Sequence, residues 1–71
     1  MSSYYKSDDG KFEAIDFIEA FGLNFNLGNV IKYVARAGRK QGEDYISDLI
    51  KAHWYITREM SRYCQEKGLI S

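Results

Sequence analysis

"EDYISDLIKAHWYITREMSRYCQEK", residues 43–67, is the stretch that decides the fold. Its apolar residues recur at the spacing of one helix face; they are Tyr45, Leu49, Ala52, Ile56, Met60 and Tyr63. Glu43 and Asp44 stand at its start, where acids favour the positive end of a helix dipole. Gly68 follows as a stop, and the chain contains no proline. We therefore predict one long helix over residues 43–67.

This helix is longer than the rest of the chain can cover. About 24 residues at ~1.5 Å per residue span ~36 Å, against ~17 Å for each of the two helices expected before it. Ile46, Ile50 and Trp54 widen its apolar face, and His53 is expected to be packed among them. Such a surplus of apolar surface requires another chain. We expect a homo-oligomer built largely on residues 49–64.

Two shorter helices are predicted upstream. The first covers about residues 11–21, capped by Asp9 or Gly10 and ended by Gly22. Its apolar positions are Ala14, Phe17, Ile18 and Phe21. The second covers about residues 26–37, with Asn24 or Asn26 as its cap and Gly38 in a left-handed position after it; its apolar positions are Leu27, Val30, Ile31 and Val34. The fold class is therefore all-α, one helical domain over residues 1–71 with an N-terminal segment at 1–9.

The composition limits what can support so small a domain. A chain of 71 residues has difficulty burying enough apolar surface by itself. A single cysteine, Cys64, excludes an intrachain disulfide, and a single histidine, His53, cannot complete a zinc site with it. Oligomerisation is the remaining support. No signal-peptide or membrane-spanning run is visible, so we expect a soluble, cytoplasmic protein without a membrane partner.

Positive charge is concentrated in "GNVIKYVARAGRK", residues 28–40, although the formal net charge is zero. The stretch holds no acid, and its cations are Lys32, Arg36, Arg39 and Lys40. Asn29, Lys32, Tyr33 and Arg36 share one helix face, and Gly28 before them lets a ligand approach closely. A matching stripe on the long helix comprises Asp44, Asp48, Lys51, Tyr55, Arg58 and Arg62.

Two interpretations of these stripes stay open. In the first, the cations hold one or two phosphates, with arginine binding bidentately and lysine as a point charge. In the second they are structural: Arg36 pairs with Asp48 to fix the packing of two helices, and the remainder is a solvated face. The charge is too localised for a duplex-binding surface, so a nucleic-acid partner is not expected.

The acids Glu13, Asp16 and Glu19 recur every third residue of the first predicted helix. They are either a solvated face or oxygen ligands for Mg²⁺, which bridges to phosphates in kinases. Neither His53 nor Cys64 has the neighbours of a catalytic nucleophile or base, so no catalytic residue and no metal ligand is assigned.

Three separated motifs resemble a family of short bacteriophage proteins of unknown function. They are Glu-x-Ile-Asp at 13–16, Gly-Asn-x-Ile-Lys-Tyr-x-x-Arg at 28–36 and Asp-Leu-x-Lys-Ala-x-x-Tyr at 48–55. The resemblance extends over about residues 4–60, and some larger phage proteins with a similar region have been described as nucleotide kinases without a P-loop. It implies a nucleotide site whose matching residues are Tyr5, Glu13, Asp16, Asn29, Lys32, Tyr33, Arg36, Asp48, Lys51 and Tyr55. The chain departs from the family pattern at Tyr4, where histidine is usual, and this weakens a catalytic interpretation.

The resemblance favours a phage nucleotide-binding protein of the host cytoplasm. It would hold a phosphorylated or cyclic nucleotide, and sequestration of a bacterial defence signal is a role suggested by analogy. The alternatives are a nucleoside monophosphate kinase, for which Mg²⁺ would be the cofactor, and a helical module that inhibits a host protein. Phosphoryl transfer must align donor, acceptor and metal, which 71 residues in three helices hardly achieve within one protomer, so a kinase site would have to be shared between protomers.

Overall fold

The computed structural model describes residues 12–39 and 44–69, and three α-helices account for most of them. They are α1 (Ala14–Phe21), α2 (Phe25–Arg36) and α3 (Tyr45–Lys67). The expectation of an all-α chain is confirmed. Over the described ranges, none of these helices is both long enough and apolar enough to cross a membrane.

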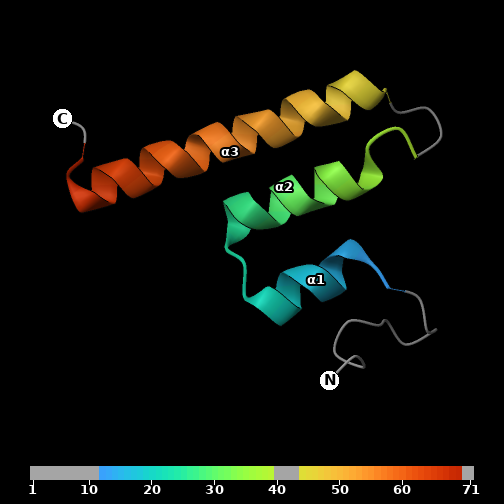
Figure 1. Cartoon of the computed structure of the whole chain (residues 1–71), viewed down its shortest axis with the longest axis horizontal. Coiled ribbons are helices and arrows are strands. Elements are labelled where there is room, and N and C mark those ends of the chain that lie inside the picture. The colour runs from blue at the N-terminus through green and yellow to red at the C-terminus, as the bar shows by residue number, and fades with distance from the viewer. Residues whose placement is uncertain (1–11, 40–43, 70–71) are drawn as a thin grey trace.

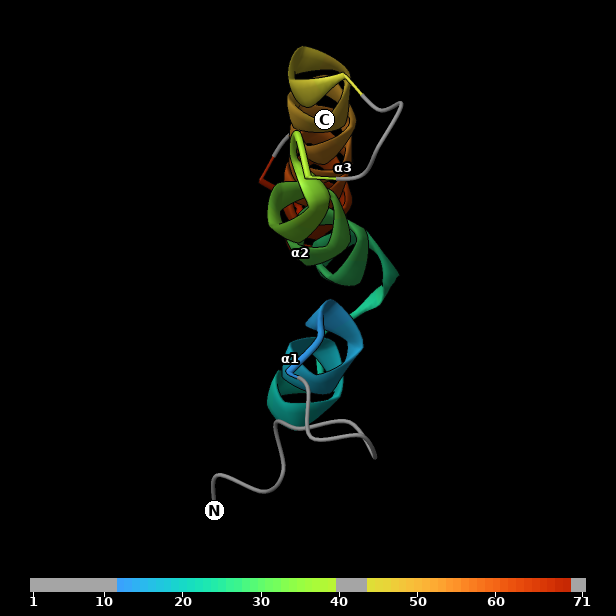
Figure 2. The ribbon, with the colours of Figure 1, turned by 90° about the vertical axis from the view of Figure 1, so that its right-hand side faces the viewer.

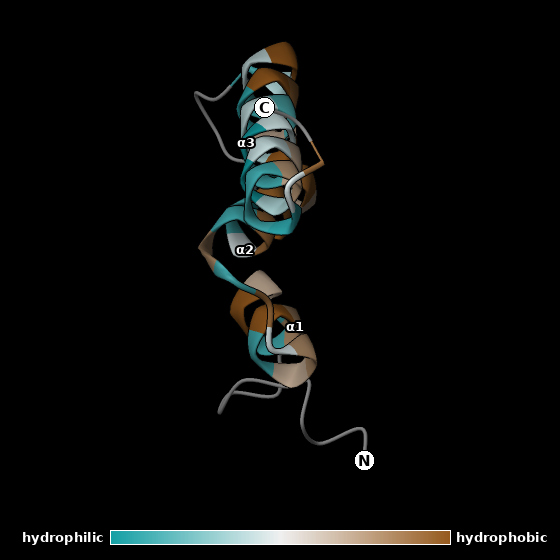
Figure 3. Ribbon diagram, turned by 90° about the vertical axis from the view of Figure 1, so that its left-hand side faces the viewer, coloured by the Kyte–Doolittle hydropathy of each residue, from teal (hydrophilic) through white to brown (hydrophobic). Residues whose placement is uncertain are grey.

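The helices lie side by side in a single layer with α2 in the middle (Figure 1). α2 packs against α1 along one side and against α3 along the other, whereas the described parts of α1 and α3 make no contact. Seen edge-on the layer is thin (Figure 2), and the chain measures 47 × 33 × 12 Å. Colouring by hydropathy shows hydrophobic residues spread along the layer (Figure 3). Ala52, 5% exposed, is the one buried hydrophobic side chain of the described ranges, so this layer has almost no interior.

The start of α1 is fixed by Glu13 and Asp16. The backbone of Glu13 is extended, at φ −124° and ψ 165°, and its N–H donates to Asp16 Oδ2 over 2.8 Å. This is one half of a capping box, and it starts the helix at Ala14 instead of residue 11. The caps proposed from the sequence, Asp9 and Gly10, lie outside the described residues.

The turn between α1 and α2 follows the sequence prediction. Gly22 adopts a left-handed conformation at φ 61°, which lets the Leu23 N–H donate to the Ile18 carbonyl over 3.0 Å. Asn24 then caps α2, because its Oδ1 accepts the Leu27 N–H over 2.9 Å. Gly22 and Asn24 together reverse the chain and place α2 against α1.

Gly28 lies against Ile18 where α2 packs on α1. A Cβ at this position would stand 3.3 Å from Ile18 Cγ2, tighter than ordinary van der Waals contact. The Gly28 N–H donates to the Asn24 carbonyl over 2.8 Å and is not free for a ligand. The missing side chain of Gly28 therefore admits Ile18 of α1, and the approach of a ligand to Gly28 stays a prediction.

Glu59 joins α2 to α3. Its carboxylate accepts hydrogen bonds from Asn24 Nδ2 and Asn26 Nδ2, both over 3.0 Å, and from the guanidinium of Arg62, the shortest over 2.8 Å. The hydrogen bonds from Arg62, Asn26 and Asn24, in that order of effect, lower the pKa of Glu59 to about 2. Asn26 is itself buried, so the network belongs to the contact between the two helices.

We predict that Glu59→Gln lowers the melting temperature by roughly 5–10 °C at neutral pH, because three donors lose their charged acceptor. The pKa of Glu59 is depressed from 4.5 in the unfolded chain, so its contribution is complete above pH 4.5 and disappears as the pH falls toward about 2. The gap between wild type and variant should close over that window in thermal melts followed by circular dichroism.

Glu66→Gln is the matched control, because Glu66 is exposed and lies 3.7 Å from Arg62. It should change the melting temperature little at any pH. Equal effects of the two substitutions would mean that the Glu59 network does not hold α2 on α3.

Candidate functional site

A cluster of aromatic and basic side chains lies across α2 and α3; we call Lys32, Tyr33, Arg36, Lys51 and Tyr55 the cationic cluster. Tyr33 is its centre: the Lys32 ammonium lies 4.6 Å, the Arg36 guanidinium 4.9 Å and the Lys51 ammonium 5.5 Å from its ring centroid. The Tyr55 ring is nearly parallel to that of Tyr33 at 6.0 Å. The structure thus brings five residues of the predicted site together from two helices.

Asp48 of α3 binds Arg36 of the cluster. Its side chain has no exposed surface, and its Oδ1 accepts hydrogen bonds from Arg36 Nε over 3.3 Å and Arg36 Nη2 over 2.9 Å. The hydrogen bond from Arg36 lowers the pKa of Asp48 against the opposing effect of burial, and the charges of Arg36 and Lys51 and the Gly38 N–H act in the same direction. The structural interpretation of this pair is therefore correct: Arg36 and Asp48 fix α2 on α3.

The two lysines of the cluster differ from Arg36 in forming no salt bridge with a described acid, although the charge of Lys51 acts on Asp48. Within residues 12–39 and 44–69, neither Lys32 nor Lys51 forms a salt bridge. Both side chains are exposed, and both stand over the same ring as the Arg36 guanidinium. Like charges gathered in this way repel one another, and an anion between them relieves the repulsion.

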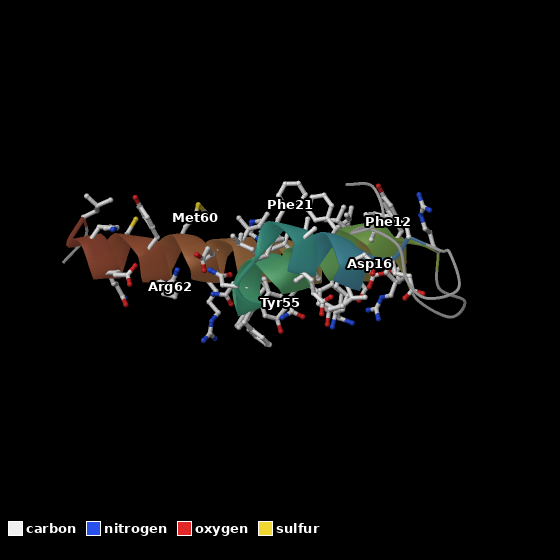
Figure 4. The ribbon with its side chains drawn as sticks, turned by 90° about the horizontal axis from the view of Figure 1, so that it is seen from below. Phe12, Asp16, Phe21, Tyr55, Met60 and Arg62 are labelled. Atoms are coloured by element: carbon white, nitrogen blue, oxygen red, sulfur yellow. The ribbon has the colours of Figure 1, made fainter. Side chains whose placement is uncertain are left out.

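Aromatic side chains extend the cluster along α3. Tyr55 contacts the edge of Phe25 at 5.9 Å and of Trp54 at 4.9 Å between ring centroids. Phe25 is 71% exposed and Trp54 55% exposed. Figure 4 shows Tyr55 on the same side of the layer as Arg62, opposite Met60 and Phe21. Flat apolar surface therefore lies next to unpaired positive charge.

Asn29 belongs to a groove that adjoins the cluster at Lys32. Its Nδ2 donates to the Phe25 carbonyl over 2.9 Å, within its own helix. Together with Lys32 and Gly28 it lines a groove of about 400 Å³ between α1 and α2. Two further predicted site residues, Tyr5 and Lys40, lie outside the described residues.

The acids of α1 do not assemble a metal site. Asp16 is buried and accepts the Glu13 N–H. In the part of the chain that the structure describes, no three His, Cys, Asp or Glu side chains are grouped so that they could hold a metal ion.

Two residues behave differently from the sequence expectations. His53 is exposed on the described chain instead of packed among apolar neighbours. Glu59 received no role from the sequence, yet it carries the second polar link between α2 and α3. The sequence did show Glu59 three residues before Arg62 on one helix face. Such spacing alone is too common to identify a hydrogen-bond network.

The fold and site define a small all-α protein that presents a cationic aromatic cluster on one side of a helical layer. Residues 1–57 match the model of the DUF3310 family, described as a protein of unknown function, and the chain belongs to this family. Comparisons with curated proteins and with solved structures gave no match.

We predict that Arg36→Ala and Asp48→Asn each lower the melting temperature by roughly 10 °C or more, because each breaks a buried ion pair from one side. Arg36→Lys should cost less, since the charge that faces Asp48 remains while one donor is lost. Arg39→Ala is the control, because this exposed residue has no ion pair within the described ranges. If Arg36→Ala melted with the control, the pair would not hold the helices together.

Proposed function

We propose that this protein binds a phosphorylated nucleotide at the cationic cluster. The observation that carries the proposal is the placement of Lys32 and Lys51, from two different helices and without a salt bridge in the described chain, over the ring of Tyr33. A phosphate between the two ammonium groups would neutralise them and bridge α2 to α3.

Arg36 contributes positive charge to this site rather than a free guanidinium fork. Its Nε and Nη2 are already directed at Asp48. The phosphate contacts are therefore assigned first to Lys32 and Lys51, which act as point charges with rotatable donors. Arg36 holds Tyr33 in place and adds to the local potential.

The aromatic side chains suit the nucleobase. Stacking on an aromatic ring accepts any base, because every base has a π-face. Phe25 and Trp54 flank Tyr55 and are largely exposed, so a base beside the phosphate has rings to stack on. A free phosphate or a sugar phosphate lacks this contact and should bind more weakly.

Two buried acids that take part in helix capping and helix packing favour nucleotide binding over phosphoryl transfer. A kinase has to place carboxylates around a metal and the reacting phosphates. Asp16 and Asp48 are both buried, the first accepting a capping hydrogen bond and the second bonded to Arg36. A protein that binds a nucleotide without converting it could sequester a nucleotide signal. This is the biological role that we propose, whether the gene belongs to a phage or to another genome.

The test is calorimetry with a panel of mono-, di- and cyclic nucleotides. The double variant Lys32→Gln, Lys51→Gln should weaken the binding of whichever nucleotide binds by roughly 2–5 kcal/mol. Its melting temperature should stay the same or rise, because a repulsion is removed. Lys67→Gln is the matched control, since the Lys67 ammonium also stands over a tyrosine ring of α3, 5.7 Å from the centroid of Tyr63.

Two results would contradict this proposal. One is the absence of binding across the panel, and the other is equal affinity of the double variant and the Lys67→Gln control. Turnover of a nucleoside monophosphate to the diphosphate with ATP and Mg²⁺ would replace binding by catalysis as the function.

We also propose that the chain self-associates and that α3 contributes to the interface. Ile56, Met60 and Tyr63 lie on one face of α3 and are 41%, 56% and 49% exposed. Light scattering at micromolar concentration should give at least twice the chain mass of 8.3 kDa. A monodisperse species of 8.3 kDa would contradict self-association.

A further inference from the structure

The two sides of the helical layer differ in character. Figure 4 shows Phe12, Phe21 and Met60 projecting from one side and Tyr55 and Arg62 from the other. We call the first side the apolar face; it comprises Phe12, Phe17, Phe21, Ile31, Val34, Ile56, Met60 and Tyr63. Tyr55 of the cationic cluster projects from the opposite side, whereas Lys32 and Arg36 of the cluster also line a groove with Phe12 and Val34.

The apolar face is continuous from α1 to α2. The rings of Phe17 and Phe21 lie 4.5 Å apart between centroids. Phe17 also lines a groove of about 560 Å³ together with Phe12, Ile31 and Val34. Lys32, Arg36 and Arg39 border the same groove, as charged residues border the apolar centre of protein interfaces.

The face continues on α3 through Met60. Ile56 and Tyr63 are four residues before and three residues after Met60, which places all three on one helix face. Phe21, Val34 and Met60, one from each helix, are 60%, 53% and 56% exposed. Large apolar side chains with more than half of their surface exposed thus occur on all three helices.

We propose that a second copy of the chain stacks on this surface, apolar face against apolar face. The product is a two-layer assembly whose core is made by α1, α2 and α3 of both copies. This extends the proposed self-association from α3 to the whole layer, and it does not depend on nucleotide binding.

A second copy fits for three physical reasons. Stable domains bury apolar surface between two layers, and a single layer with one buried apolar residue in its described ranges lacks the second. Each copy lacks a second layer over its apolar face. In a two-fold dimer each copy provides the second layer for the other. The formal net charge is zero, so no long-range repulsion opposes the approach.

The size of the layer is sufficient for such a pairing. The chain measures 47 × 33 Å in the plane of the layer. A standard stable interface needs only about 800 Å² per partner, which is a fraction of a surface of these dimensions. Stacking leaves Tyr55 and Arg62 of both copies on the outside, because they project from the side opposite the apolar face.

The test uses two exposed aliphatic residues on different sides of the molecule. Val34 lies on the apolar face, while Ile50 lies two residues beyond the buried Asp48 and so points roughly 200° around α3 from it, away from α2. Val34→Glu and Met60→Glu should both convert the oligomer to the 8.3 kDa monomer in sedimentation velocity at micromolar concentration. Ile50→Glu should leave the mass of the wild-type protein unchanged.

A charge at Val34 could also unfold a chain that depends on its partner, and circular dichroism reveals this. Val34→Thr, of the same shape, then replaces it and should raise the dissociation constant roughly tenfold or more, while Ile50→Thr should not.

Dissociation by Met60→Glu alone, with both Val34 variants still associated, would restrict the interface to α3 and overturn the proposal. If the wild-type protein were a monomer and Val34→Glu destabilised it, the apolar face would be covered by the same chain. This result would also overturn the proposal. Calorimetry on the dissociated Met60→Glu variant keeps the two proposals distinguishable, because nucleotide binding should persist there.

Discussion

The hydrogen-bonded pair of Arg36 and Asp48 is the interaction on which the rest of the structure depends. Asp48 is completely buried in the first turns of α3, and its carboxylate would be costly there without the guanidinium at 2.9 Å. The same guanidinium stands over Tyr33, which in turn stacks on Tyr55. One ion pair therefore sets the separation of α2 and α3 and the arrangement of the cationic cluster. This explains how a chain with almost no apolar interior can hold two helices in a defined register.

The division of labour among the cations follows from this pair. From the sequence, Lys32, Arg36, Lys40 and Lys51 were all candidates for a phosphate site. In the folded chain Arg36 is committed to Asp48 and Arg62 to Glu59, whereas Lys32 and Lys51 form no salt bridge within the described ranges. The positive charge left for a ligand is thus a small part of what the composition suggests. A pair of lysines beside flat aromatic rings suits a compact, multiply charged anion that carries a planar group, and it does not suit the long phosphate track of a duplex.

The sequence predicted local structure well and contacts between helices poorly. Gly22 and Asn24 identified the turn between α1 and α2 because left-handed glycine and asparagine caps act within a few residues. Arg36 and Asp48 were recognised as one of two interpretations because both lay on polar stripes. Glu59 was missed because its partners Asn24 and Asn26 are 35 and 33 residues away. The packing role of Gly28 was missed for the same cause, since nothing near it in the chain indicates that Ile18 will pack there.

The double use of Asn24 has a consequence for how the chain folds. Its Oδ1 caps α2, while its Nδ2 donates to Glu59 on α3. The side chain that starts one helix is therefore held in its capping orientation by another helix far along the chain. The amide of Asn24 thus couples the start of α2 to its packing on α3. We therefore expect α2 to reach its full helix content only when α3 docks. Helix formation and docking should then occur as one cooperative event, and a fragment that ends before α3 would lose part of its helix initiation signal together with its packing surface.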